Sequence, residues 1–217
     1  MKQKLNIIFV VLVLFTQCRT SKNPFYKDIQ NFKKADVKEK PARDIILFIG
    51  SSSFTYWNDI KEDLHKENIL NRAFGGSTLS DLLLFKKDII NKYKPGKIVI
   101  YCGENDIAGS ETVSSGDVFS RFKKLYKRIR RTFPAVPLVY ISLKPSPSRW
   151  KMRDRMMAAN MLIAGYIKTQ KNIVFINIWD KMLNNNGYPR SEIFRADSLH
   201  MNKNGYNIWI KELHAVL

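Results

Sequence analysis

Four short stretches of this chain carry residues that could together perform acyl transfer. Gly50-Ser51-Ser52-Ser53 offers a hydroxyl, and Gly75-Gly76 offers backbone N–H groups that glycine lets a ligand approach closely. Gly103-Glu104-Asn105-Asp106 offers the donor of a side-chain amide. Asp197-Ser198-Leu199-His200 places a carboxylate three residues before an imidazole, where it can fix the tautomer and orientation that a hydrolase base needs.

Each stretch taken alone has a more ordinary explanation. Gly-Ser-Ser-Ser and Gly-Gly-Ser-Thr are more often turns followed by a helix N-cap, Asn-Asp after a strand is common turn chemistry, and a lone Asp-x-x-His is more often a surface loop. The combination is what predicts chemistry. A hydroxyl, a backbone donor, an amide donor and an oriented base are the parts of a serine-dependent acyl-transfer site.

The elements around these stretches predict how they meet. Continuously apolar, β-branched runs are typical of strands buried on both faces, and here they alternate with segments of helical spacing. The predicted strands of this kind are residues 45–49, 97–101, 137–141 and 173–177, a shorter strand is expected at 69–74, and the predicted helices are 80–93, 120–133, 152–168 and 202–217. This alternation predicts a three-layer α/β domain with a roughly five-stranded parallel sheet, in which ligands bind at the carboxyl ends of the strands.

In order and spacing, the four stretches resemble the SGNH or GDSL-like hydrolase family, from about residue 45 to residue 217. The resemblance implies a flavodoxin-like α/β/α fold and a serine esterase or acylhydrolase activity. It assigns Ser52 as the nucleophile and Asp197 with His200 as the base pair. It also assigns the oxyanion hole to the backbone of Ser52 and Gly76 and to the side chain of Asn105.

Two positions depart from the family pattern. Ser51 stands where an Asp is common, which changes the hydrogen bonds of the turn but keeps the nucleophile. Glu104 stands where many members have Gly and adds a carboxylate near the site. Residues 144–150, Lys-Pro-Ser-Pro-Ser-Arg-Trp, resemble members described as lysophospholipase-like esterases. The Gly-x-Ser-x-Gly elbow of the α/β-hydrolases is absent from the chain, which disfavours that fold.

The resemblance leaves the substrate open, because the family hydrolyses lipid esters, carbohydrate O-acetyl groups and thioesters on one scaffold. The chain has no long apolar insertion that would form an acyl channel, so we favour short acyl groups, chiefly acetyl on a glycan. The alternatives are a lysophospholipase or thioesterase acting on lipid acyl groups, and a non-catalytic lipoprotein that holds an envelope polymer. The candidate substrate contacts are Trp57, Glu104, Arg149 and Trp150, although core packing explains a Trp equally well.

The other His and Cys residues are not expected to take part. His65 and His214 have no carboxylate spaced as Asp197 is, so both are predicted to lie at the surface. Cys102, at a strand end, is predicted to be a small core residue. Because two Cys and three His are scattered singly, a zinc site is disfavoured, and we expect no metal and no cofactor.

The N-terminus is typical of an export signal. Two lysines precede an apolar run over residues 7–15, and Cys18 follows in an arrangement that resembles the lipobox of bacterial lipoproteins. We expect a signal peptide over residues 1–17, a lipid-anchored tether over 18–43 with a short helix around 26–32, and the catalytic domain over 44–217. The expected location is the cell envelope, facing the periplasm, with the lipid anchor in a membrane. A plain cleaved signal is the alternative, because Gln17 replaces the small residue usual before that Cys.

The composition fits one domain of 217 residues, and its net charge of +18 indicates an anionic partner of some kind. Residues 121–131 hold seven basic and no acidic residues opposite an apolar stripe, which is typical of a solvated helix face that can lie near anionic lipid headgroups. Lys144, Arg149, Lys151 and Arg153 follow a strand end, where they could steer an acidic substrate. No nucleic-acid module is recognisable, so no nucleic-acid partner is expected.

Overall fold

The structure, a computed structural model, describes residues 23–217. These residues divide into two compact units, one ending at Lys40 and the other spanning Pro41–Leu217, and each is described by itself. The first contains helix α2 (Tyr26–Lys38), which is longer than the helix expected around residues 26–32. The expected signal peptide and Cys18 lie outside the described residues. Within the described part of the chain, no helix is both long enough and apolar enough to cross a membrane.

Five parallel strands form the centre of the second unit, in the order β2-β1-β3-β4-β5. Their bounds are β1 Arg43–Gly50, β2 Ile69–Asn71, β3 Lys94–Tyr101, β4 Leu138–Ile141 and β5 Ile173–Ile176. The apolar runs of the sequence occupy this sheet because helices cover both of its faces. The prediction of an α/β fold with a five-stranded parallel sheet is confirmed.

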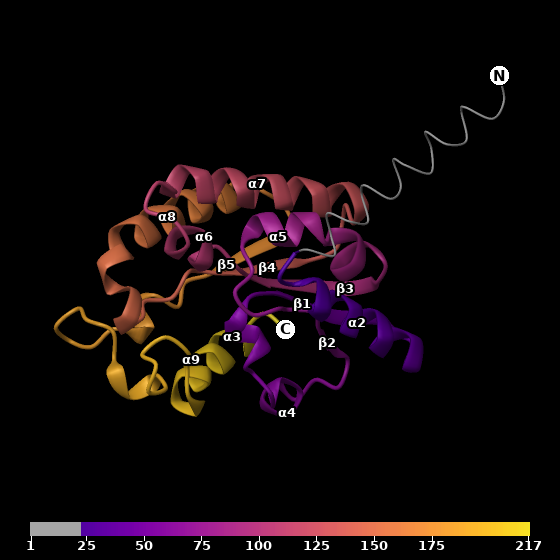
Figure 1. The fold of residues 1–217 in the computed structure, drawn as a ribbon, viewed down its shortest axis with the longest axis horizontal. Coiled ribbons are helices and arrows are strands. Elements are labelled where there is room, and N and C mark those ends of the chain that lie inside the picture. Colours follow the sequence, from indigo (N-terminus) through magenta and orange to yellow (C-terminus); the bar gives the residue numbers. More distant parts are fainter. Residues whose placement is uncertain (1–22) are drawn as a thin grey trace, which may run out of the picture. The chain divides into compact units, whose positions relative to one another are not determined.

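Figure 1 shows the two helical layers. One face of the sheet carries α5 (Leu79–Leu84), α7 (Ser115–Thr132) and α8 (Arg153–Lys168), and the other carries α3 (Ser52–Thr55), α4 (Ile60–Leu64) and α9 (Lys203–His214). The short elements are the π-helix η1 (Lys87–Asn91), α6 (Glu104–Ala108), and the 3-10 helices η2 (Pro147–Met152), η3 (Asp180–Met182) and η4 (Ser191–Ile193). Because all five strands are parallel, the loops that leave their carboxyl ends gather at one edge of the sheet.

Helix α7 begins at Ser115 rather than at residue 120. Ser114 and Asp117 form a capping box in which each side chain accepts the other residue's backbone N–H, at 3.1 and 2.9 Å. Its buried apolar stripe consists of Val118, Phe122, Leu125, Tyr126 and Ile129, whereas Phe133, expected at the end of this stripe, is the half-buried C-cap residue. The prediction missed the start of this helix because it followed the apolar spacing and not the capping signal.

Two further elements are shorter than predicted. The helix expected over residues 80–93 is instead α5 followed by η1, whose wider turn brings both Ile89 and Ile90 to full burial. Strand β2 ends at Asn71 rather than at residue 74. The Asn71 side chain accepts a hydrogen bond from the N–H of Ala73 at 3.0 Å, which turns the chain out of the strand.

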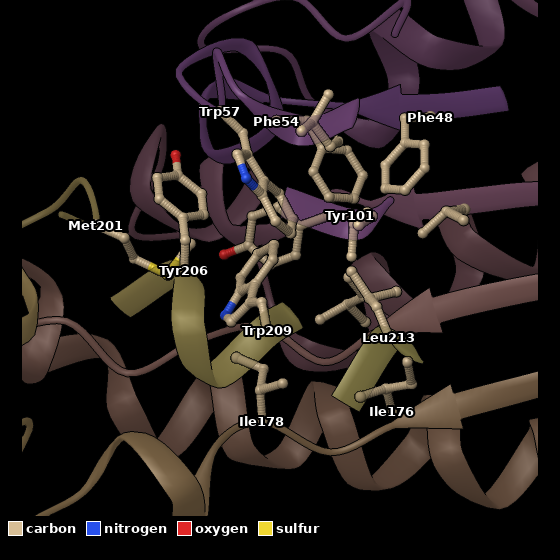
Figure 2. Close-up of a cluster of buried hydrophobic side chains, with 14 of the residues drawn as sticks. Phe48, Phe54, Trp57, Tyr101, Ile176, Ile178, Met201, Tyr206, Trp209 and Leu213 are labelled. Atoms are coloured by element: carbon tan, nitrogen blue, oxygen red, sulfur yellow. The ribbon is translucent and has the colours of Figure 1, made fainter. Parts of the chain in front are cut away.

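The core on the α9 side of the sheet is rich in aromatic residues. Figure 2 shows Trp209 of α9 against Phe54 and Tyr101, with ring centroids 5.9 and 4.7 Å apart. These three side chains are completely buried. Phe54 belongs to α3, which begins with Ser52, and Tyr101 is the last residue of β3. The packing of α9 therefore supports the two strand ends where the predicted nucleophile and amide donor lie.

Candidate active site

Ser52 is the first residue of α3, directly after the end of β1. The turn needs Gly50, whose φ is +151° and whose Cβ, if it had one, would lie 2.0 Å from the carbonyl oxygen of Tyr101. Ser52 is thereby held at the carboxyl edge of the sheet. Helix α3 is a single turn, so any helix dipole at Ser52 is small, and nearby N–H groups must supply most of any stabilisation of negative charge.

The Gly75-Gly76 loop lies beside Ser52. An ideal Cβ on Gly75 would be 4.0 Å from the Cβ of Ser52, and Gly76 has a φ of +81°. The loop is tied to the end of β1, because the N–H of Phe74 and the hydroxyl of Ser77 each donate to the carbonyl oxygen of Gly50 at 3.0 Å. The loop with the predicted backbone donor therefore lies next to the loop with the predicted nucleophile, and hydrogen bonds hold the two loops together.

The amide of Asn105 is fixed on both sides. Its Nδ2 donates to the carbonyl oxygen of Ser77 at 3.0 Å, and its Oδ1 accepts from the guanidinium of Arg149 at 2.9 Å. The buried thiol of Cys102 also faces the Ser77 carbonyl, with Sγ 3.6 Å from the oxygen. Ser77 is completely buried and joins the ends of β1, β2 and β3. The sequence held no signal for this role, since it depends largely on a backbone carbonyl that every residue has.

Asp197 and His200 form the pair that the sequence predicted. His200 Nδ1 lies 2.6 Å from Asp197 Oδ2, and Asp197 Oδ1 accepts the N–H groups of Leu199 and His200, both at 2.9 Å. Burial acts to raise the pKa of Asp197, but these hydrogen bonds and the nearby imidazole outweigh it and lower the pKa. The carboxyl therefore stays ionised and holds the proton of the ring on Nδ1, which leaves Nε2 as the basic nitrogen.

Tyr56 connects this pair with Ser52. Its N–H donates to the carbonyl oxygen of Ser52 at 2.8 Å, and its ring meets the ring of His200 edge-on, with centroids 4.6 Å apart. The guanidinium carbon of Arg195 lies 5.3 Å from the centroid of the Tyr56 ring. The backbone N–H of Arg195 donates to the carbonyl oxygen of His200 at 2.8 Å. The imidazole thus lies beside the helical turn that begins with Ser52. Neither Tyr56 nor Arg195 was singled out from the sequence, because their contacts join residues far apart in the chain.

Glu104 is a buried ion-pair partner and not the open substrate contact that the sequence predicted. Its side chain is 4% exposed, and its carboxylate lies 2.8 Å from Lys144 Nζ and 2.9 Å from Arg149 Nη1, while the hydroxyl of Tyr101 also donates to it. Burial acts to raise the pKa of Glu104, but the two cations and these hydrogen bonds outweigh it, so the pKa is lowered. Lys144 is 1% exposed, so it too is a structural cation and cannot steer a substrate from solution.

The two candidate tryptophans differ. Trp57 packs mainly into the core, because it is 2% exposed, stacks on Tyr206 with centroids 4.8 Å apart, and donates its Nε1 hydrogen to Asp63 at 2.8 Å, but it also lies in the lining of a polar depression. Trp150 is half-buried in η2, with its ring centroid 5.6 Å from that of Tyr188. Trp57 therefore contributes to the floor of that depression, whereas Trp150 lies in the loop that follows β4.

His65, His214 and Cys102 lie where the sequence predicted. His65 and His214 are exposed and stack on each other, with centroids 6.0 Å apart. Cys102 is completely buried, and burial raises the pKa of its thiol well above the usual value. Among residues 23–217, no group of three or more His, Cys, Asp and Glu side chains could hold a metal ion.

Hollows on the described surface of this domain include a polar one and an apolar one. A polar depression of about 140 Å³ is lined by Tyr56, Trp57, Asn58, Asp59, Asp63, Arg195, Asn202, Lys203 and Tyr206. A mostly apolar groove of about 210 Å³ lies over α8 and the end of β5, lined by Met157, Met161, Ala164, Phe175 and Trp179. The first includes Tyr56, which touches His200. The second lies at β5, and β3 and β4 separate it from β1, a span of about 14 Å at the usual strand spacing.

The chain is similar to known hydrolases. Residues 49–208 match the family described as GDSL-like lipase/acylhydrolase. A solved GDSL-like lipase from Bacteroides thetaiotaomicron has a TM-score of 0.72 and 19% identity, with 86% of this chain and 95% of that chain covered. A variant of an acetyl-xylooligosaccharide esterase from Geobacillus Stearmophilus has a TM-score of 0.61 and 15% identity, with 80% and 94% covered.

A longer protein also matches in sequence. N-acylneuraminate cytidylyltransferase from Escherichia coli O18:K1:H7 is 24% identical over 195 residues, which are 88% of this chain and 45% of that protein. The chain therefore spans less than half the length of this relative. The family match, in contrast, extends over most of the chain and includes every strand-end stretch described above. The chain belongs to the GDSL-like lipase/acylhydrolase family.

Proposed function

We propose that the protein is a serine esterase that works through an acyl-enzyme on Ser52. The observation that carries this proposal is the position of His200. Its ring is oriented by Asp197 at 2.6 Å and lies against the ring of Tyr56, whose backbone N–H donates to the carbonyl oxygen of Ser52. A hydroxyl at a strand end, a base held in one tautomer and an anchored set of donors are the requirements of this chemistry.

The reaction proceeds in two halves. Ser52 Oγ attacks the ester carbonyl while His200 Nε2 takes its proton, and the negative charge of the tetrahedral intermediate falls on the former carbonyl oxygen. The N–H groups of Ser52 and Gly76 and the second hydrogen of Asn105 Nδ2 stabilise that oxygen. Collapse of the intermediate expels the alcohol, which takes the proton from His200. Water then attacks the acyl-enzyme with the same base, releasing the acid and restoring Ser52.

We propose a short acyl group, chiefly acetyl on a glycan hydroxyl, as the substrate. The depression beside Tyr56 supports this choice, because its lining of amide, carboxylate, cationic and aromatic side chains suits a sugar better than an alkyl chain. The apolar groove at β5 is about 14 Å from β1, too far for a short acyl group on Ser52 to reach. The similarity to an esterase that acts on acetylated xylooligosaccharides agrees with this proposal.

The alternative substrate is a lipid acyl ester or thioester, and the apolar groove is the observation that favours it. A long chain attached near Ser52 could extend along the sheet edge to Met157 and Trp179. A screen of acetylated saccharides, lysophospholipids and acyl thioesters separates the two proposals. Turnover confined to long-chain lipids would overturn the glycan assignment and leave the acyl-enzyme proposal intact.

Ser52→Ala tests the mechanism, with Ser53→Ala as the matched control. Ser53 is the next residue of the same turn, but it is 2% exposed, so its hydroxyl cannot reach a substrate. Hydrolysis of p-nitrophenyl acetate should disappear in Ser52→Ala and persist in Ser53→Ala. A serine-directed organophosphonate should label the Ser52 peptide of the wild-type protein. Absence of both turnover and labelling would favour a non-catalytic envelope-binding protein of the same fold.

We also propose that the protein is an exported lipoprotein anchored through Cys18. The support is the sequence alone, with its apolar run over residues 7–15 followed by that cysteine. Mass spectrometry of the mature N-terminal peptide should find acyl groups on Cys18, and Cys18→Ala should release the protein from the membrane fraction. A mature protein that begins elsewhere and carries no lipid would indicate a plain cleaved signal.

A further inference from the structure

Arg149 bridges the proposed oxyanion donor and the buried ion pair. One guanidinium nitrogen donates to Asn105 Oδ1 at 2.9 Å, and the other lies 2.9 Å from Glu104 Oε1. The Arg149 side chain is 18% exposed. The sequence predicted Arg149 as a substrate contact, but in the structure its two terminal nitrogens are occupied by neighbouring residues of α6. Its influence on the reaction must therefore pass largely through Asn105.

An amide side chain is ambiguous unless its neighbours choose its orientation. The last torsion of Asn has two broad minima that exchange Oδ1 and Nδ2. In the observed orientation Oδ1 meets a guanidinium donor and Nδ2 meets the carbonyl oxygen of Ser77. In a flipped Asn105, the N–H donors of Nδ2 would face the N–H donors of Arg149, and the acceptor Oδ1 would face the carbonyl oxygen of Ser77. It would also turn an acceptor, in place of a donor, toward the substrate oxygen.

The guanidinium itself is held firmly. Glu104 is 4% exposed and is fixed in turn by Lys144, at 2.8 Å, and by the hydroxyl of Tyr101. A planar guanidinium presents two parallel donors, so it can satisfy the carboxylate of Glu104 and the amide of Asn105 at the same time. An ammonium group is a single point charge and cannot hold both acceptors in this fixed geometry.

We propose that Arg149 is a positioning residue of the esterase, which locks the Asn105 amide with Nδ2 directed at the oxyanion. This proposal rests on the proposed function, in which Asn105 is an oxyanion donor. Arg149 then contributes to the transition state and little to substrate binding. Its loss should therefore lower kcat and change KM little, because the oxyanion forms only as the reaction proceeds.

The test is a double-mutant cycle with p-nitrophenyl acetate, a neutral substrate. Arg149→Met in the wild-type background should lower kcat about 10- to 100-fold, less than the complete loss of one donor. In the Asn105→Ala background the same substitution should change kcat by less than about threefold, because the amide that Arg149 orients is gone. Lys168→Met is the charge-matched control, since Lys168 is the exposed last residue of α8, and it should leave both backgrounds unchanged.

Arg149→Lys keeps the charge and serves as the second variant if Arg149→Met does not fold. It should give a smaller fall in kcat that also disappears in the Asn105→Ala background. Thermal melting and organophosphonate labelling of Ser52 confirm that each variant keeps its fold and its nucleophile.

Several results would overturn the proposal. An equal fall in kcat in both backgrounds would mean that Arg149 acts on the reaction independently of Asn105. A rise in KM with unchanged kcat would make Arg149 a substrate contact. If Asn105→Ala alone keeps full kcat while Ser52→Ala is inactive, the oxyanion role of Asn105 fails and the nucleophile assignment remains.

Discussion

Replacing Glu104 with glutamine should destabilise the domain strongly, because the change leaves a buried cation without its anion. Lys144 is 1% exposed and its Nζ lies 2.8 Å from the Glu104 carboxylate. Removing one partner of a buried ion pair typically costs about 3–5 kcal/mol, from a total unfolding free energy of about 5–15 kcal/mol. For a domain of this size, the corresponding fall in melting temperature is about 6–20 °C.

The direction in which the stability of Glu104→Gln changes with pH follows from the pKa of Lys144. Burial lowers the pKa of Lys144, and the charge and hydrogen bonds of Glu104 oppose that effect. Glu104→Gln removes the opposition, so the pKa of Lys144 in the folded state falls further below its unfolded value. The unfolded chain then binds more protons than the folded one, and stability rises with pH. The deficit in unfolding free energy relative to wild type should therefore shrink as the pH rises from neutral toward about 10.

Urea denaturation of wild type and variant, at neutral and at alkaline pH, measures both quantities. The double variant Glu104→Gln/Lys144→Met is the control, because removing both charges leaves no stranded cation and should restore most of the stability. A Glu104→Gln variant within about 1 kcal/mol of wild type at every pH would refute the reasoning, since a buried pair cannot lose its anion at so small a cost.

Four further outcomes follow from the site. Asn105→Ala should lower kcat for p-nitrophenyl acetate about 10²–10³-fold with little change in melting temperature, and a loss below tenfold would remove it from the oxyanion hole. Asp197→Asn should lower kcat up to about 10⁴-fold through the wrong imidazole tautomer, while calorimetry finds the fold intact, because this side chain is 48% exposed. Gly50→Ala should lower the melting temperature and abolish organophosphonate labelling, since its Cβ would lie 2.0 Å from the Tyr101 carbonyl oxygen; a normally labelled variant contradicts this. If exposed cations such as Lys151 steer acidic substrates, turnover of an acidic ester should fall with ionic strength while that of a neutral ester stays constant.

The sequence predicted the parts of the site whose chemistry lies in the side chain itself. Ser52, Asn105 and His200 stand out by type and by their place after apolar runs, and the structure brings all three to the same edge of the sheet. The five-stranded parallel sheet was predictable because β1, β3, β4 and β5 each contain a continuous apolar run, whereas β2 is short and ends at Asn71.

The parts that escaped prediction depend on the fold. Ser77 joins three strand ends through one hydroxyl and one backbone carbonyl, which no sequence pattern reveals. Glu104 was predicted to be a substrate contact because polar residues near strand ends are typical of binding sites, yet it is buried against Lys144, a partner distant in the chain. The type of a residue near a strand end therefore predicts where a site lies, but it does not predict whether that residue is exposed to substrate or buried.

The proposed catalytic residues lie in two parts of the domain that differ in local stability. The attachment of Ser77 to the end of β1 anchors the first part to the sheet. The proposed nucleophile and oxyanion donors, which are Ser52, Gly76 and Asn105, are fastened to central strands, whereas Asp197 of the proposed base pair is half-exposed on a loop beyond β5. Segments with exposed backbone hydrogen bonds open at lower free energy than buried strands. On gentle warming, the loop that carries the base should open before the sheet melts. Heat inactivation would then begin as a reversible local event, with early amide exchange at residues 195–202 and protected amides in β1 and β3.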